Sequence, residues 1–464
     1  MRCAVLMPNI WRGGILNFGV LISNIISEIE FDGRSTEVSF CVPNGYNLDL
    51  IVGLNDSVNV ITFDHAPYKA DFAFRTFVQN KAAPSLKDVH GVGSLNDMTY
   101  PRASGGALDI VLADVWVLLT GLFNYGPIIP LKPYLVYAPD FIQRIVPEIY
   151  DDPPISPAWM MNAWQALALQ RSAGVIVTSN QTGKDALTYA GVRPDKIHRL
   201  PMANAPLFKE DPNLAEKIVR KRKKIAQYLP AEGGRAPSSA LPPAAARKTS
   251  DEDRGRNEEE TLDDIIAADR PYFLWVTNTT VHKNQQRALQ ALERYYEEGG
   301  ALRCVICGAD TDRYRKPSQL PVVNAIYERL RSSPALQENA YLAGEVGNER
   351  FRQLLTEAAF LWHNVIYDNG TFSVIEAARV GTPCLVSAYP QMIEILEHFS
   401  IEAELFDPWD LADAARGLKA MEKKLAEGEP RAPKDIGDQD RIIFREKLAD
   451  LLRGALRETT ETAL

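Results

Sequence analysis

The sequence predicts an α/β protein with two doubly wound domains, each formed around a parallel sheet. Short apolar runs alternate with stretches of helical spacing through both halves of the chain, which is typical of successive strand–helix–strand units. A length of 464 residues is too great for one ordinary core. Residues 230–264, rich in Ala, Pro, Gly and charge, separate the two halves and predict a disordered linker.

The first half begins with an apolar strand over residues 3–7, a turn at 12–14 and a helix over 15–29. A second helix, capped by Ser179 or Asn180, is expected to end at Tyr189. The other apolar runs predict strands at 38–42, 58–63, 108–113, 134–138, 174–178 and 197–201. Residues 64–106 follow neither period, and an irregular segment of this length is expected to be functional or disordered.

The second half opens with a basic helix over 214–228 that contains five consecutive cations at 220–224. This run is interpreted as a solvated helix face, with contact to an anionic membrane as the alternative. Asn284 is expected to cap a helix that ends at Gly299-Gly300. Strands are predicted at 272–277, 302–307, 340–343, 360–367 and 384–387, and helices at 411–426 and 441–456. The predicted domains are 1–209 and 268–437, joined by the helix and linker of 210–267.

Composition and charge exclude several classes of protein. A net charge of −9 argues against general nucleic-acid binding. The five scattered cysteines indicate a reducing compartment, and Cys304 and Cys307 are interpreted as buried strand residues because no second Cys/His pair completes a metal site. The first apolar run is too short for a signal peptide, and the apolar window 107–130 contains charges. A cytoplasmic protein is therefore expected, with weak peripheral contact at the inner face of the membrane as a further possibility.

The segment 368–376, Asp-Asn-Gly-Thr-Phe-Ser-Val-Ile-Glu, is the most informative motif. It follows an apolar run and precedes a Gly-Thr-Pro return, so it predicts a strand, a loop and the first turn of a helix. Asp368 and Glu376 would then be two carboxylates that accept hydrogen bonds from several sugar or ribose hydroxyls. Ser373 and Glu376 also fit a capping box, and the two interpretations are compatible.

Three further positions lie where a strand is expected to end. Gly13 and Gly14 would let backbone N–H groups approach a phosphate at a helix N-terminus, although an ordinary tight turn explains them as well. Lys283, next to His282, precedes another helix; a cation there is better explained by a bound diphosphate, with a solvated lysine as the alternative. Asp140 leaves a strand of the first domain, and its alternative role is a helix cap or an Asx turn.

These motifs resemble those of glycosyltransferase family 4. Residues 368–376 are similar to the family's Glu-x7-Glu donor signature, with Asp368 in the first position and Glu376 in the second. Residues 275–284 resemble the segment whose Arg-Lys pair holds the donor pyrophosphate, with His282 in place of Arg. Asp140 matches the acid of a His-Asp pair, with Pro139 in place of His. The resemblance also includes 172–179 and 342–346.

The resemblance implies a GT-B fold, in which two Rossmann-like domains face a central cleft and a last helix, about 438–464, packs back on the first domain. It implies retaining transfer of a hexose, of mannose or glucose type, from a GDP- or UDP-linked sugar to a glycan or lipid-linked acceptor in cell-surface polysaccharide synthesis. No metal or cofactor is expected. A non-catalytic sugar-nucleotide or glycan-binding module and a GT-B epimerase are the rival functions.

Under the transferase interpretation, Asp140, Lys283 and Asp368 would be catalytic. Lys283 would stabilise charge on the leaving diphosphate, Asp368 would contact the sugar hydroxyls and Glu376 would hold the ribose. The residues predicted to bind the substrate are Gly13, Gly14, His282, Lys283, Asp368, Asn369, Gly370, Thr371, Phe372 and Glu376.

Overall fold

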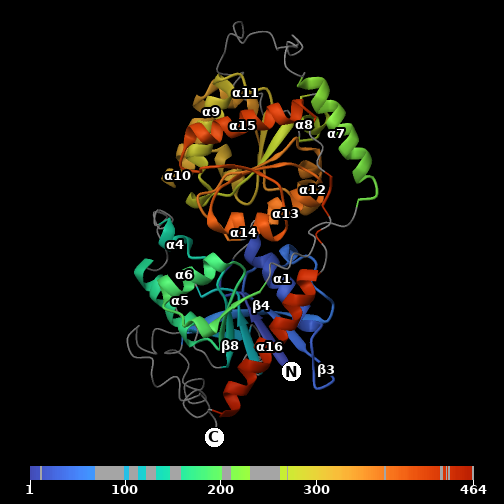
Figure 1. Ribbon diagram of the computed structural model, residues 1–464. Coiled ribbons are helices and arrows are strands. Elements are labelled where there is room, and N and C mark those ends of the chain that lie inside the picture. Colours follow the sequence, from blue (N-terminus) through green and yellow to red (C-terminus); the bar gives the residue numbers. More distant parts are fainter. Residues whose placement is uncertain are drawn as a thin grey trace. The chain divides into compact units, whose positions relative to one another are not determined.

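The computed structural model describes residues 1–10, 13–67, 99–103, 113–121, 132–146, 158–200, 211–229, 262–268, 270–369, 372–428, 432–434, 436 and 439–461. The chain separates into two compact units (Figure 1). The first unit comprises Met1–Ala205, Asp368–Gly370 and Gly437–Leu464, and the second comprises Pro206–Tyr367 and Thr371–Ile436.

The first unit is organised around a sheet with the strand order β10-β9-β8-β7-β1-β4-β5-β6. All neighbouring strands in it are parallel except β5 and β6, which are antiparallel. The strands are β1 Arg2–Leu6, β4 Glu37–Pro43, β5 Val58–Pro67, β6 Thr99–Ala103, β7 Val115–Leu118, β8 Tyr134–Tyr137, β9 Gly174–Val177 and β10 Ile197–Arg199, with a separate small hairpin of β2 Glu30–Phe31 and β3 Arg34–Ser35.

Both faces of this sheet are buried, which explains why its strands are continuous apolar runs in the sequence. Along β1, Cys3 and Val5 belong to one apolar cluster, and Ala4 and Leu6 to another. Successive side chains of a strand point to opposite faces, so the two clusters are the cores on the two sides of the sheet.

Helices cover this sheet, and local signals define several of their ends. In α6, Asn180–Ala190, the Ser179 hydroxyl accepts a hydrogen bond from the Thr182 N–H at 3.0 Å, so Ser179 is the N-cap as predicted. The last helix packs against the first one and β8 (Figure 1). The helices of this unit are α1 Gly14–Ser27, α4 Ile142–Ile145, α5 Ala158–Arg171, α6 and α16 Gln439–Glu461.

The second unit has a fully parallel sheet with the order β13-β12-β11-β14-β15-β16. Strands β12 and β13 thus extend the sheet on one side of β11, and β14, β15 and β16 extend it on the other side, as in doubly wound dinucleotide-binding folds. The strands are β11 Tyr272–Val276, β12 Arg303–Cys307, β13 Ala340–Gly344, β14 Leu361–His363, β15 Cys384–Ser387 and β16 Glu404–Phe406.

Helices α9, α10, α11 and α15 of this unit pack together, whereas α13 packs against β14 and β15 (Figure 1). In α15 the Asp410 side chain accepts hydrogen bonds from the Ala412 and Asp413 N–H groups and fixes the N-terminus. The helices are α7 Leu214–Tyr228, α8 Leu262–Ala267, α9 Gln285–Glu297, α10 Pro321–Ser332, α11 Pro334–Asn339, α12 Asn348–Glu357, α13 Phe372–Arg379, α14 Pro390–His398 and α15 Leu411–Ala426.

Several sequence-based expectations need correction. Segment 64–106, predicted to be irregular, contains the end of β5 and all of β6. These two strands are antiparallel, and no local sequence pattern predicts their pairing. The strand predicted at 108–113 lies outside the described residues apart from Ala113, and the observed strand β7 begins at Val115. The linker predicted at 230–264 also lies outside them up to residue 261, after which α8 begins at Leu262. Cys304 and Cys307 are buried in β12, as predicted.

Strand β14 is shorter than the predicted 360–367 because the chain leaves the sheet after His363. The Val365 N–H donates to Ser387 Oγ at 2.9 Å, and the Ile366 N–H donates to the His282 carbonyl at 2.8 Å. In the described part of the chain, no helix has the length and apolar content needed to cross a membrane.

Candidate functional site

The connection from β11 to α9 carries the predicted basic pair. Asn278 forms an Asx turn in which its Oδ1 accepts from the Thr280 N–H at 2.9 Å, and the 3₁₀ helix η8, Val281–Lys283, follows. His282 is buried, whereas Lys283 is partly exposed and lies two residues before the start of α9. An anion bound at this helix N-terminus would interact with both the helix dipole and the Lys283 ammonium.

Two buried side chains fix the shape of this connection. Gln285 Nε2 donates to the carbonyls of Thr280, at 2.8 Å, and Asn278. The Tyr314 hydroxyl donates to the Asn278 carbonyl at 3.0 Å, and burial raises the pKa of this phenol, so it stays a neutral donor. The loop that carries Lys283 is therefore held from two sides.

The next connection along the sheet edge follows β14. His363 and Asn364 are almost fully buried there. The hydrogen bond from the Ile366 N–H to the His282 carbonyl, at 2.8 Å, joins this connection directly to the basic one. Strands β11 and β14 are neighbours although β12 and β13 lie between them in the sequence, so this is the point where the strand order reverses. In open α/β sheets, ligands bind beyond the carboxyl ends of the strands at such a point.

The acidic motif begins beyond the β14 connection. Asp368 is partly exposed, and its Oδ1 accepts a hydrogen bond from the Asn369 N–H at 2.8 Å. Both residues group with the first unit, although they follow a strand of the second. Gly370 and Thr371, also predicted to bind the substrate, lie outside the described residues.

Helix α13 begins at Phe372, so the capping-box interpretation of Ser373 and Glu376 is wrong: Ser373 lies inside the helix and cannot be its N-cap. Phe372 is partly exposed. Glu376 is 1% exposed, and its Oε1 lies 3.7 Å from Arg379 Nη1 one turn later. A buried carboxylate needs such a partner, because burial without an opposite charge is costly.

In the first unit, Gly13 and Gly14 begin the helix that follows β1. Gly13 has φ 67° at the N-cap position of α1, a backbone conformation that strongly favours glycine. Both glycines are exposed. Strands β1 and β7 are the neighbours at which the order of this sheet reverses, so the pair occupies the position in the first unit that the Lys283 connection occupies in the second.

Asp140 follows β8 at the same edge of the first sheet and is partly exposed. Its Oδ1 accepts a hydrogen bond from the Ile142 N–H at 3.2 Å, which is the Asx turn considered as its alternative role. Below it, Gln143 Nε2 donates to Gln165 Oε1 at 2.6 Å, and Gln165 Nε2 lies 3.4 Å from the Asp140 carbonyl.

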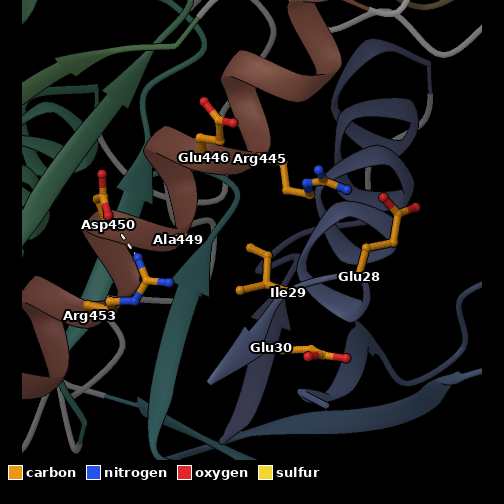
Figure 2. Close-up of a pocket in the computed structure, with 8 residues that line it drawn as sticks. All are labelled: Glu28, Ile29, Glu30, Arg445, Glu446, Ala449, Asp450 and Arg453. Atoms are coloured by element: carbon orange, nitrogen blue, oxygen red, sulfur yellow. Dashed lines mark hydrogen bonds and ion pairs between the residues drawn. The ribbon is translucent and has the colours of Figure 1, made fainter. Parts of the chain in front are cut away.

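A separate pocket of about 440 Å³ lies in the first unit between α16 and the end of α1 (Figure 2). Its lining residues are Glu28, Ile29, Glu30, Arg445, Glu446, Ala449, Asp450 and Arg453. Most of them are charged, and Arg453 pairs with Asp450 at 2.8 Å (Figure 2). Small-molecule sites are mostly apolar with a few convergent polar groups, so this pocket is a poor candidate for one, and it contains none of the predicted residues. No group of three or more His, Cys, Asp or Glu among the described residues is placed to hold a metal ion.

The structure gives Asn284 a role that the sequence did not predict. Asn284, predicted as a side-chain cap, has left-handed backbone angles and makes no capping hydrogen bond. Its Nδ2 instead donates to Asn364 Oδ1 at 3.1 Å and to the Pro408 carbonyl at 2.9 Å. Asn364 could have been identified as a candidate because it is a polar residue directly after an apolar strand. Its hydrogen bond with Asn284 could not be predicted without knowing the order of the strands.

Comparisons with known proteins identify a domain in the second unit and the fold of the chain. Residues 258–434 match the family model of the glycosyl transferases group 1. The segment contains the basic connection, the acidic motif and α13, so the second unit carries a glycosyltransferase domain. None of the curated proteins matches the chain in sequence.

Solved structures match nearly the whole chain. HepE from Anabaena, in complex with UDP-glucose, has a TM-score of 0.57 at 12% identity, over 98% of this chain and 99% of that one. WaaG, a glycosyltransferase involved in lipopolysaccharide biosynthesis, has a TM-score of 0.56 at 13% identity, over 97% and 99%. Sucrose-phosphate synthase from Thermosynechococcus elongatus has a TM-score of 0.55 at 13% identity, over 100% and 99%.

At these identities the similarity establishes the fold. The predicted GT-B fold with two Rossmann-like domains is confirmed. The match of residues 258–434 to the glycosyl transferases group 1 confirms the predicted enzyme class, a glycosyltransferase.

Proposed function

We propose that this glycosyltransferase belongs to the family 4 type and transfers a hexose, of mannose or glucose type, from a nucleotide diphosphate sugar to a glycan or lipid-linked acceptor. The proposal rests on the hydrogen bond from the Ile366 N–H to the His282 carbonyl. This tie joins the loop of Lys283, after β11, to the loop after β14 at the point where the strand order of the second sheet reverses. This tie places a cation, a helix N-terminus and the approach to the acidic motif on one sheet edge. HepE, a protein of the same fold, is known in complex with UDP-glucose, which favours a nucleotide diphosphate sugar as the donor.

In the proposed reaction the bond between the anomeric carbon and the diphosphate oxygen breaks, and the acceptor oxygen bonds to the same face of the sugar. The acceptor proton passes to the departing phosphate oxygen. Lys283 and the N-terminus of α9 stabilise the charge on that phosphate. Asp368 contacts the sugar hydroxyls, Glu376 accepts hydrogen bonds from the ribose hydroxyls, and Asp140 orients the acceptor. Gly13, Gly14 and His282 complete the surroundings of the donor, and the product serves cell-surface polysaccharide synthesis at the inner face of the membrane.

A thermal-shift panel of GDP- and UDP-sugars tests the donor class. A ligand at 100 times its Kd adds about 2.7 kcal/mol to the free energy of unfolding, so one nucleotide should raise the Tm clearly. Lys283→Ala should abolish that rise, whereas Lys316→Ala, an exposed lysine of the same unit, should keep it.

NMR of the transferred product should show retained anomeric configuration. An inverted product, or conversion of the donor to an epimer without acceptor, would contradict the proposal.

The role of Glu376 predicts a specific kinetic loss. Removing a buried charged hydrogen-bond partner costs about 2–4 kcal/mol, so Glu376→Gln should lower transfer at least about tenfold. Glu349→Gln is the matched control, because Glu349 lies on α12 of the same unit with its side chain 82% exposed. Unchanged kinetics in a folded Glu376→Gln enzyme would remove this residue from the donor site.

Asp140 requires two substitutions, because it also forms an Asx turn. Asp140→Asn keeps the shape and most of the turn but removes the charge, whereas Asp140→Ala removes both. A catalytic or orienting role predicts a large loss of transfer by Asp140→Asn at normal Tm and normal donor binding. A fully active Asn variant beside an Ala variant that only melts earlier would assign Asp140 to the turn alone.

A further inference from the structure

Asn284 adopts a backbone conformation that few residues tolerate. Its φ of 58° and ψ of 30° are left-handed, a region that costs most L-residues about 1–2 kcal/mol and that Gly, Asn and Asp enter most readily. It precedes the first residue of α9, yet its side chain caps no N–H group of that helix. The side chain, almost fully buried, points elsewhere.

The Asn284 amide connects three segments of the second unit. Its Nδ2 donates to Asn364 Oδ1 at 3.1 Å, after β14, and to the Pro408 carbonyl at 2.9 Å, after β16. Asn284 itself follows β11. The two N–H groups of one side chain thus hold together three connections at the carboxyl edge of the sheet. Both acceptors are oxygens, so no apolar side chain can replace this donor.

Both chain neighbours of Lys283 are hydrogen-bonded to the connection that follows β14. On one side the His282 carbonyl accepts from the Ile366 N–H at 2.8 Å, and on the other the Asn284 amide reaches Asn364. The backbone of Lys283 is therefore fixed relative to the β14 connection at both neighbouring residues. That connection leads to Asp368 and then to α13.

We propose that Asn284 is a positioning residue, which sets Lys283 against the β14 connection through the Asn284–Asn364 amide pair. The left-handed turn at Asn284 sends the chain into α9, while its side chain fixes the distance between the cation and the loop that precedes the acidic motif. The role of Lys283 in donor binding is taken from the proposed function, and the test separates the two.

Asn284→Gly is the informative variant, because glycine keeps the left-handed backbone and deletes only the amide. It should lower kcat/KM for transfer about tenfold, as expected for loss of a buried hydrogen-bond donor that orients a charged group. Ser400→Gly is the matched control: Ser400 also has a positive φ, 48°, but lies after α14 and is exposed. It should leave kcat/KM unchanged.

A double-mutant comparison separates positioning from a general loss of stability. In a Lys283→Ala background, Asn284→Gly should cause no further loss of donor affinity, since the group that it positions is gone. Asn364→Ala should reproduce the effect of Asn284→Gly, and the pair should be less than additive. Assays are run well below the Tm of every variant.

The outcomes distinguish the two claims. If Lys283→Ala leaves donor affinity unchanged, the proposed function of Lys283 fails. If Lys283→Ala weakens the donor but Asn284→Gly does not, only the positioning role is refuted. Equal losses by Asn284→Gly in the presence and absence of Lys283 would likewise overturn it and leave a purely structural role.

Discussion

At the scale of single residues, Lys221 shows how strongly the fold can change the chemistry of a side chain. It lies on α7, is only 5% exposed, and donates from Nζ to Thr382 Oγ1 at 3.0 Å. Burial lowers the pKa of its ammonium to about 7, although Glu357 opposes the shift. Thr382 in turn donates to the Leu355 carbonyl at 2.7 Å, so the lysine closes a small buried network.

This pKa predicts a pH-dependent stability with a defined sign. An unfolded lysine titrates near pH 10.4, so between about pH 7 and 10 the unfolded chain holds a proton that the folded chain lacks. Stability therefore rises with pH in this window, and below pH 7, where both forms are protonated, the slope disappears. Lys221→Met should lack this contribution. Between pH 7 and 9, urea unfolding should show the difference between wild type and variant shifting by roughly 2 kcal/mol in favour of wild type. A constant difference would mean that Lys221 is charged when folded.

The sequence predicted α7 and its basic run but not this burial. Interpreting 220–224 as a solvated face is wrong at Lys221, because Ile218 and Ile225, three residues before it and four after it, are buried on the same stripe. That spacing was the available signal. In contrast, the partner of Lys221 is 161 residues away, and no local pattern contains it. For the same reason the hydrogen bond between Asn284 and Asn364 could not be predicted from the sequence. Lys283, beside Asn284, could be identified as a candidate site residue from its charge and position.

At the scale of elements, helix α1 depends on one backbone conformation at its start. Gly13 has a φ of 67°, and a Cβ added there would meet no atom within 4 Å. Gly13→Ala should therefore destabilise the first unit by strain alone, about 1–2 kcal/mol in chemical denaturation. Gly347 also precedes a helix and is equally unobstructed, but its φ is −69°. Gly347→Ala should cost less than about 1 kcal/mol. Equal effects of the two substitutions would show that the positive φ is not required.

Elements with a strong period were predicted well, and those defined by distant partners were not. The ends of α7 and α15 agree with the prediction because apolar spacing and, in α15, the Asp410 cap are local. Strand β6 was missed since only its pairing with β5 makes it a strand. Strand β14 ends early because Ser387 and His282 take the hydrogen bonds of the residues that follow it. Tertiary partners override local preference in both strands.

At the scale of the whole molecule, the chain completes its first unit last. Helix α16 follows the entire second unit in sequence, yet its Phe444, Leu448 and Leu452 belong to the apolar core beneath β1 and α1. Phe444 lies edge-on to Phe18 of α1, with ring centroids 6.0 Å apart. Strand alternation predicted two domains, but the order of strands in either sheet depends on pairings between distant segments, which one sequence does not reveal.

This connectivity predicts that the first unit cannot be stable without the end of the chain. Leu448 is fully buried, so Leu448→Ala should lower the free energy of unfolding of that unit by about 2–5 kcal/mol. Ile442 on the same helix is 48% exposed, and Ile442→Ala should change this free energy by less than about 0.5 kcal/mol.

Deleting residues 439–464 should uncover the α1 core and leave the first unit unfolded or aggregated. Because the buried apolar residues of α16 belong to the core of the first unit, the second unit should keep its own melting transition. A truncated chain in which the first unit melts as before would show that α16 adds no stability to it.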